Sequence, residues 1–226
     1  MTQNPVSSRS VGATGEGTPE ESRGPLRAVA LVCTLTPSPA ESSSELLGRQ
    51  LLEAFARHDV AGELVRVVDH DVRPGVELDM GDGDEWPSIR ARLMAADILA
   101  LATPTWLGQP SSVAQRVLER LDAELSETDE SGRLETLGKV AVAAVVGNED
   151  GAHHVSAVLY QALNDVGFTL AAQAVTYWND EVKGQYRNFK DLPRTPEGVE
   201  QTTETVAANA AHLARLLRTA PYPPPQ

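Results

Sequence analysis

Short apolar runs without polar alternation constrain the fold of this 226-residue chain more than any other feature. A run of this kind is typical of a strand that is covered on both faces, because a strand with one wet face alternates apolar and polar residues. Strands are predicted over residues 28–34, 63–68, 97–103, 139–146 and 168–176.

Between the predicted strands, apolar residues recur at three- and four-residue steps, which is the pattern of a helix with one buried face. Strands that alternate with such helices predict an α/β fold with a five-stranded parallel sheet and helices on both faces. For right-handed crossovers the common strand order is 2-1-3-4-5, a doubly wound sheet with a ligand crevice at the ends of the first and third strands. Helices are predicted from about Ser43 to His58, from about Glu85, from about Ser111, along 155–166 with Gly167 as the C-cap, and along 206–217.

Composition divides the chain into one domain and two tails. Residues 1–25 are rich in Ser, Gly, Thr, Glu and Pro and poor in bulky apolar side chains, so a disordered tail is expected there. Residues 26–219 form a single predicted domain, and the 41% hydrophobic residues of the whole chain suffice to build its core. Residues 220–226 form a second, Pro-rich tail that is expected to be extended.

Charge and cysteine content exclude several classes of function. The formal net charge of -13 argues against nucleic acid and anionic membrane surfaces as partners. The single cysteine, Cys33, rules out an intramolecular disulfide, argues against a thiolate metal site, and is expected to be a small buried hydrophobe. No apolar run reaches the roughly 18 residues of a membrane span, and a signal peptide's apolar core is lacking, so we expect a cytoplasmic protein.

The loop after the first strand, residues 33–45, has the composition of an anion site. It joins a strand to a helix N-terminus, where backbone N–H groups and the helix dipole favour negative charge. It lacks Lys, Arg and the Gly-rich spacing of a nucleoside triphosphate loop, so it suits a single phosphate held by neutral donors, as in an FMN site. An ordinary helix cap by Ser42 or Ser43 is the alternative. The candidate ligands are the hydroxyls of Thr34, Thr36, Ser42, Ser43 and Ser44.

The loop after the third strand reads Thr-Pro-Thr-Trp-Leu-Gly-Gln-Pro-Ser-Ser over residues 103–112. Its prolines stiffen the backbone, Trp106 offers an aromatic face, and Gly108 allows close approach to the main chain. Such features suit a flat ring with polar edges, such as an isoalloxazine. A structural turn whose tryptophan fills the core is the alternative. The candidate ring contacts are Pro104, Thr105, Trp106, Leu107 and Gly108.

The loop after the fourth strand, residues 147–154, leads directly into a helix. Its glycines permit tight turns, and its polar side chains can cap the helix or hydrogen-bond the pyrimidine edge of a flavin. The adjacent His153 and His154 point about 100° apart on a helix, so we do not expect them to hold one metal ion, and no metal ligand is predicted. The candidate contacts are Gly147, Asn148, Glu149, Asp150, Gly151 and His154.

Together these three loops resemble the flavodoxin-like superfamily, in its branch of NADPH-dependent FMN reductases and NAD(P)H:quinone reductases. The similarity covers residues 27–218, and the second loop resembles the flavin loop of that branch. The resemblance implies FMN as cofactor and NAD(P)H as co-substrate, with the serines of the first loop at the phosphate and the other two loops along the ring. It also implies a homodimer or homotetramer. In one departure, the first loop begins Cys33-Thr34 where family loops often begin Gly-Ser.

The resulting hypothesis is an FMN-dependent oxidoreductase that takes hydride from NAD(P)H onto flavin N5 and passes electrons to a quinone, a flavin or another small acceptor. The cofactor carries this chemistry, and the sequence holds no nucleophile elbow or zinc-protease motif. Two alternatives remain open. One is an FMN-binding electron carrier without its own nicotinamide site, and the other is a flavin-free flavodoxin-like interaction module.

Two further features lie outside these loops. The carboxylates within residues 82–85 are expected to form a solvated loop face. Residues 177–195 form a long connection before the last helix, and such connections usually serve a function or an interface. We expect it to lid the flavin or, by preference, to pack on a second subunit, because apolar side chains on an acidic surface need cover. Its aromatic residues are Tyr177, Trp178, Tyr186 and Phe189.

Overall fold

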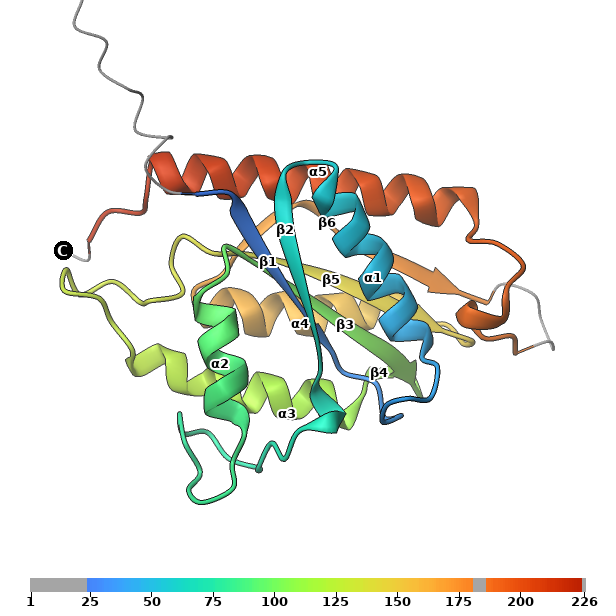
Figure 1. The fold of residues 1–226 in the computed structure, drawn as a ribbon, viewed down its shortest axis with the longest axis horizontal. Coiled ribbons are helices and arrows are strands. Elements are labelled where there is room, and N and C mark those ends of the chain that lie inside the picture. Colours follow the sequence, from blue (N-terminus) through green and yellow to red (C-terminus); the bar gives the residue numbers. More distant parts are fainter. Residues whose placement is uncertain (1–23, 181–185, 225–226) are drawn as a thin grey trace, which may run out of the picture.

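The sheet follows the predicted doubly wound path with one addition. In the computed structural model, which describes residues 24–180 and 186–224, five parallel strands lie in the order β2-β1-β3-β5-β6 (Figure 1). They are β1 (Leu26–Val32), β2 (Val60–Arg66), β3 (Ile98–Trp106), β5 (Val140–Gly147) and β6 (Thr169–Asn179). A sixth strand, β4 (Gln109–Pro110), pairs antiparallel with the end of β3, so the predicted five-stranded sheet is one strand short.

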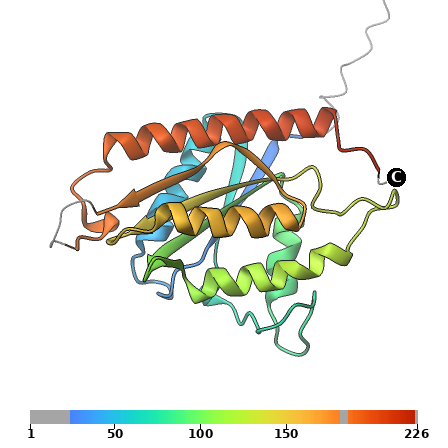
Figure 2. The ribbon, with the colours of Figure 1, turned by 180° about the vertical axis from the view of Figure 1, so that it is seen from behind.

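Helices cover both faces of the sheet, as predicted (Figures 1 and 2). One face carries α1 (Ser43–Ala56) and α5 (Glu197–Thr219). The other face carries α2 (Trp86–Met94), α3 (Ser112–Leu121) and α4 (Ala152–Asp165). Short 3-10 turns, η2 (Val67–Asp69), η3 (Asp122–Ser126) and η4 (Phe189–Asp191), lie in the connections.

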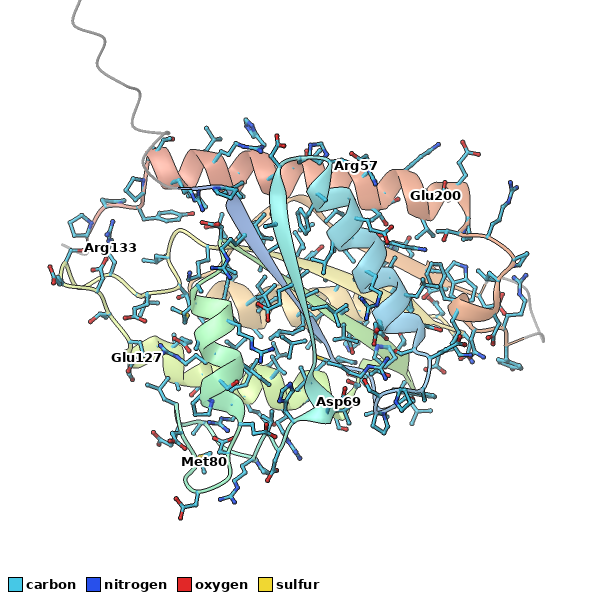
Figure 3. The ribbon with its side chains drawn as sticks, in the orientation of Figure 1. Arg57, Asp69, Met80, Glu127, Arg133 and Glu200 are labelled. Atoms are coloured by element: carbon cyan, nitrogen blue, oxygen red, sulfur yellow. The ribbon has the colours of Figure 1, made fainter. Side chains whose placement is uncertain are left out.

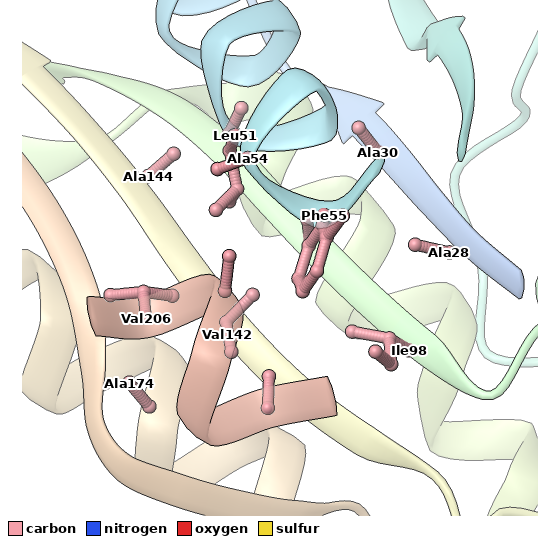
Figure 4. Packing of buried hydrophobic residues seen from close by; sticks show 14 of the residues in the cluster. Ala28, Ala30, Leu51, Ala54, Phe55, Ile98, Val142, Ala144, Ala174 and Val206 are labelled. Carbon is pink, nitrogen blue, oxygen red and sulfur yellow. The ribbon is translucent and has the colours of Figure 1, made fainter. Parts of the chain in front are cut away.

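Successive residues of the central strands point into two separate cores. In β1, Ala30 belongs to the core under α1 and α5, whereas Leu31 belongs to the core under α2, α3 and α4. Figure 4 shows the first of these cores, in which Phe55 of α1, Val206 of α5 and Val142 of β5 share one cluster. Because both faces are dry, successive positions of the central strands are mostly apolar, which explains the missing alternation in the sequence.

Gly167 lies one residue after the C-cap of α4, which is Val166, and not at the predicted C-cap position itself. Its φ is +97°, its N–H donates to the carbonyl of Asn164 (3.0 Å), and a Cβ there would lie 2.4 Å from Oγ1 of Thr136. Glycine adopts this left-handed conformation without strain and leaves room for the threonine. Helix α4 therefore ends at a fixed point, directly before β6.

A buried ion pair fixes the long connection between β2 and α2. The guanidinium of Arg120, in α3, donates to Oδ2 of Asp84 (2.7 Å), and both side chains are fully buried. Arg120 also donates to the carbonyls of Arg73 and Glu77, and its guanidinium carbon lies 5.6 Å from the ring centre of Trp86. One side chain thus joins three points of a connection that has little regular structure of its own.

Asp84 is the acidic centre of this arrangement. Burial alone would raise the pKa of Asp84, but hydrogen bonds from the N–H of Met80, from Arg120 and from the N–H of Arg73 lower the pKa to about 2. Met80, labelled in Figure 3, marks this part of the connection. The expectation of a solvated carboxylate face at residues 82–85 is therefore wrong for Asp84.

The predicted tails lie at the limits of the described residues. Residues 1–23 and 225–226 lie outside them, and with them most of the predicted N-terminal tail. In the predicted C-terminal tail, the carbonyl of Tyr222 accepts from Arg133 (3.0 Å), and its hydroxyl lies 3.0 Å from that of Thr169. Within the described part of the chain, no helix combines the length and the apolarity that crossing a bilayer requires.

Candidate functional site

The three predicted loops meet at the carboxyl ends of β1, β3 and β5, where they line one pocket of about 220 Å³. Neighbouring parallel strands place the loops that follow them at the same edge of the sheet (Figure 1). The structure therefore brings these segments together, and their role as flavin contacts stays a prediction. The predicted residues that line the pocket are Thr34, Thr36, Ser42, Ser43, Ser44, Pro104, Thr105, Trp106, Gly147 and Asn148.

The other predicted contacts do not line the pocket. The N–H of Gly108 donates to Oε1 of Glu149 (3.2 Å), and Nε2 of His154 lies 3.1 Å from Oε1 of Gln109. These contacts join the second loop to the third, so the residues shape the pocket without lining it. The predicted residues outside the lining are Leu107, Gly108, Glu149, Asp150, Gly151 and His154.

The serines at the start of α1 both cap the helix and face the pocket. Ser42 is the N-cap, and its Oγ accepts from the N–H of Glu45 (3.3 Å). Oγ of Ser43 accepts from the backbone N–H of Lys190 (3.2 Å). Because a hydroxyl that accepts a bond keeps its own proton to donate, both serines still offer an O–H group to an anion. The cap and the anion site are therefore compatible at the same residues.

Arg66, at the end of β2, holds the first loop in shape. Its buried guanidinium donates to the carbonyls of Ala40 (2.8 Å) and Thr36 (3.3 Å), and it forms an ion pair with Glu45 in the first turn of α1. Partial burial opposes ionisation of Glu45, but hydrogen bonds from Arg49 and Arg66 outweigh it and lower the pKa of Glu45. The loop is therefore fixed before any ligand arrives.

Asp69, labelled in Figure 3, restrains the same loop at a second point. Its carboxylate accepts from the N–H (2.8 Å) and from the hydroxyl (2.5 Å) of Ser38, and the hydroxyl bond lowers the pKa of Asp69. Neither Arg66 nor Asp69 is among the residues predicted for the site. Both could have been found from the predicted strand order, because that order places the end of β2 beside the loop that follows β1.

The second loop is the end of a hairpin. Strand β3 continues through Pro104 and Thr105 to Trp106, three residues beyond its predicted end, and Leu107 and Gly108 form the turn to β4. Both turn residues have positive φ, 52° and 73°, as in a type I′ hairpin. The turn leaves Trp106 52% exposed and Leu107 91% exposed. The alternative in which the tryptophan fills the core is therefore wrong.

Thr105 carries a buried hydroxyl that has no hydrogen-bond partner among the described residues. The residue is 3% exposed and lines the pocket. A buried polar atom without a partner is unfavourable by about 1–3 kcal/mol, so a ligand that hydrogen-bonds Oγ1 would remove this penalty. The pocket thus fits a cofactor with a polar edge, and the ring carbonyls of FMN meet that requirement.

Two glycines let the third loop approach the second. A Cβ on Gly147 would lie 3.0 Å from Cβ of Thr105, and a Cβ on Gly151 would lie 2.8 Å from Cα of Gly108. The φ of Gly151 is +139°, a backbone conformation that residues with a side chain rarely adopt. Glycine at these two positions therefore allows the loops to close one wall of the pocket.

We expect Gly151→Ala to destabilise the protein by about 1–3 kcal/mol and to weaken FMN binding. The backbone strain and the contact with Gly108 both oppose the new methyl group, so the hairpin must move. Urea unfolding and FMN titration measure the two effects. Gly81→Ala is the matched control, because its φ is +94° but its Cβ would meet no atom within 4 Å. An FMN affinity of Gly151→Ala equal to that of the unmodified protein would contradict the prediction.

His153 and His154 point to different neighbours, as adjacent helical positions should. The ring of His153 packs edge-on against Tyr177 with 5.1 Å between ring centres, whereas His154 contacts Gln109. Among residues 24–180 and 186–224, no group of three or more His, Cys, Asp or Glu side chains is placed to hold a metal ion. Cys33 is fully buried, as expected, and burial raises the pKa of its thiol.

The aromatic residues before α5 contribute to the pocket. Tyr177 and Trp178 belong to β6, not to the connection that follows it, and Trp178 packs against Phe189 with 5.6 Å between ring centres. Trp178 and Phe189 both line the pocket, while Tyr186 is exposed. Residues 181–185 lie outside the described residues. Packing of this connection on a second subunit stays a prediction.

Lys190 brings a positive charge to a site that was predicted to use neutral donors. Its Nζ lies 2.8 Å from Oδ1 of Asp191 and 3.6 Å from Oε2 of Glu41. The hydrogen bond to Asp191 raises the pKa of Lys190 and so favours its charged form. The sequence near the first loop gives no indication of this residue, because Lys190 lies 147 positions from Ser43. The pocket-lining residues that the sequence analysis did not propose as contacts are Leu35, Glu41, Val146, Trp178, Asn188, Phe189 and Lys190.

Comparison with known proteins agrees with this geometry. The model of the NADPH-dependent FMN reductase family matches residues 27–181. The 8-demethyl-8-aminoriboflavin-5'-phosphate synthase of Streptomyces davaonensis is 31% identical over 215 residues, which cover 87% of this chain and 80% of that protein. The divalent metal cation transporter MntH of Mycobacterium bovis is 35% identical over 199 residues, which cover 85% of this chain, but this chain spans only 29% of that protein's length.

Solved structures share the fold. RosB, in a crystal structure with the bound intermediate 8-demethyl-8-formylriboflavin-5'-phosphate, has a TM-score of 0.75 and 30% identity, with 87% of this chain and 82% of that chain covered. An NADH:FMN oxidoreductase in its apo form has a TM-score of 0.56 and 17% identity, with 84% and 89% covered. The family model spans most of the described chain, and one relative is covered over most of its own length. The chain therefore belongs to the NADPH-dependent FMN reductase family.

Proposed function

We propose that this chain is an FMN-dependent oxidoreductase that takes hydride from NAD(P)H onto flavin N5 and passes the electrons to a quinone, a flavin or another small acceptor. The observation that carries the proposal is one pocket in which the serines of a helix N-terminus, the stiff end of β3 and the β5–α4 loop meet. It combines groups suited to a phosphate with groups suited to a flat ring. Membership of the family supports the same cofactor.

In this proposal the N-terminus of α1 would hold the phosphate. Ser42, Ser43 and Ser44 supply hydroxyls, and the first backbone N–H groups of the helix have no acceptor within it. Arg66 positions the loop from behind through its bonds to the loop carbonyls. The end of β3 would hold the ring, and the hydroxyl of Thr105 would hydrogen-bond its polar edge.

Bound FMN supplies the redox chemistry, because its ring accepts a hydride and returns electrons to an acceptor. The protein would bind and orient the ring, and would leave part of it accessible. A pocket of about 220 Å³ is smaller than the roughly 300–1,000 Å³ that enclose a drug-sized ligand. Trp106 lines this pocket and is half exposed. A second flat reactant therefore has room to approach the part of the ring that the pocket leaves uncovered.

Anaerobic reduction tests the proposal. We expect the protein loaded with FMN to lose its blue absorbance band rapidly on mixing with NADPH or NADH, and to regain it when a quinone or free flavin is added. An electron carrier without a nicotinamide site would bind FMN, but the absorbance band of its flavin would disappear no faster than that of free FMN under the same conditions. A flavin-free interaction module would not bind FMN at all. Stopped-flow absorbance with both nicotinamides and several acceptors distinguishes these outcomes.

A second candidate function makes the flavin a substrate. It is favoured by the sequence identities, because the aminoriboflavin phosphate synthase and RosB are 31% and 30% identical to this chain, whereas the NADH:FMN oxidoreductase is 17% identical. In this case FMN would leave the pocket chemically altered. Mass spectrometry of the flavin recovered after prolonged incubation decides between the two, because a reductase returns FMN with unchanged mass.

We also propose a homodimer or homotetramer. Trp106, Leu107 and Tyr186 expose large apolar or aromatic side chains on an acidic protein, and such side chains are commonly covered by a partner. Light scattering coupled to gel filtration measures the mass in solution.

A further inference from the structure

Lys190 is the charged donor of the candidate pocket. Of the lining residues in the described part of the chain, it alone carries a cationic side chain. Its backbone N–H donates to Oγ of Ser43 (3.2 Å), which holds the residue beside the first turn of α1. The side chain is partly exposed, so its ammonium group has room to move.

The neutral donors at α1 do not balance the charge of a phosphate monoester. Such a group carries about -1.5 to -2 charges near neutral pH, whereas a helix N-terminus contributes only about half a positive charge. The first loop has no Lys or Arg, and Arg66 is already paired with Glu45. Glu41 adds negative charge to the pocket lining. A cation in the same pocket would therefore strengthen the binding of a phosphate at these neutral donors.

The present partners of Lys190 are easily exchanged. Asp191 is half exposed and Glu41 is 83% exposed, and exposed ion pairs contribute little to stability. A lysine ammonium sits on a flexible stem with three donors. It can therefore turn from these carboxylates to a phosphate in the same pocket at little cost in stability.

We propose that Lys190 binds the phosphate of FMN and gives the site its preference for phosphorylated flavin over riboflavin, an inference that rests on the proposed function. An independent observation indicates that this pocket holds a ligand, namely the buried Thr105 hydroxyl that has no partner in the described residues. The charge missing from the first loop is thus supplied by a segment 147 positions away.

Titration of Lys190→Gln with FMN and with riboflavin tests this assignment, because riboflavin carries the same ring without the phosphate. We expect the variant to bind FMN about 10- to 100-fold more weakly and to bind riboflavin as the unmodified protein does. Quenching of flavin fluorescence measures both affinities. Lys190→Arg, which keeps the charge, is expected to retain the preference for FMN.

Arg194→Gln is the matched control. Arg194 is exposed on the same connection and, within the residues that the structure describes, makes no hydrogen bond or ion pair. The substitution makes the same change in net charge and should leave both affinities unchanged. Equal losses for FMN and riboflavin in Lys190→Gln, or an equal FMN loss in Arg194→Gln, would overturn the inference and leave the proposed function intact. Failure of the unmodified protein to bind FMN would overturn both.

Discussion

Replacing Arg120 with methionine is expected to lower the free energy of unfolding by about 3–5 kcal/mol, the range found when one partner of a buried ion pair is removed. Arg120 and Asp84 are both fully buried, so the variant leaves an uncompensated carboxylate inside the protein. It also removes the donors to the carbonyls of Arg73 and Glu77. Urea unfolding followed by circular dichroism measures the loss.

The pH dependence separates a lost charge partner from lost packing. In the unmodified protein the pKa of Asp84 lies at about 2, below its ordinary 3.8, so its charge stabilises the fold above about pH 4 and that contribution is lost as the pH falls towards 2. In Arg120→Met the pKa of Asp84 rises, so the stability deficit should shrink on acidification. Adding Asp84→Asn should restore part of the stability. The account would be contradicted if the loss of stability in Arg120→Met stayed the same at every pH and in the presence of Asp84→Asn.

Sequence periodicity is enough to predict the layers of this fold but not the ends of its strands. The run 98–102 is apolar because both faces of β3 are covered, and that pattern is visible in the chain. Beyond it, β3 continues because Pro104 lies in register with Val146 and Thr105 pairs with Pro110. These pairings are made by residues outside the apolar run. The hairpin that adds β4 is therefore not apparent from the pattern of apolar residues in the sequence.

The candidate site divides in the same way. The serines before α1 and the residues of the β3 and β5 loops follow predicted strands directly, so their meeting at one edge follows from the topology. Arg66 and Lys190 reach the first loop from distant segments, and the contact with Lys190 depends on how the connection before α5 folds back. Asp84 was predicted to be solvated, but its side chain is buried against Arg120. The sequence around Asp84 does not distinguish a buried ion-pair partner from an exposed loop carboxylate.

Ser43→Asp is expected to weaken FMN binding by about a thousandfold or more. Two like charges about 4 Å apart near a protein surface repel by about 4 kcal/mol, and each 1.4 kcal/mol is a factor of ten in affinity. Ser43 lines the pocket in the first turn of α1, where the proposed function places the phosphate. Fluorescence titration with FMN measures the loss.

This substitution separates binding from folding, because a carboxylate in the first turn of α1 interacts favourably with the helix dipole and can still accept the N–H of Lys190. The unfolding transition should therefore stay near that of the unmodified protein. Ser43→Asn, of similar shape but neutral, is the control and should retain FMN within several-fold. Riboflavin has no phosphate, so its affinity for Ser43→Asp should be almost the same as its affinity for the unmodified protein. An unchanged FMN affinity in Ser43→Asp would indicate that the phosphate binds away from the first turn of α1.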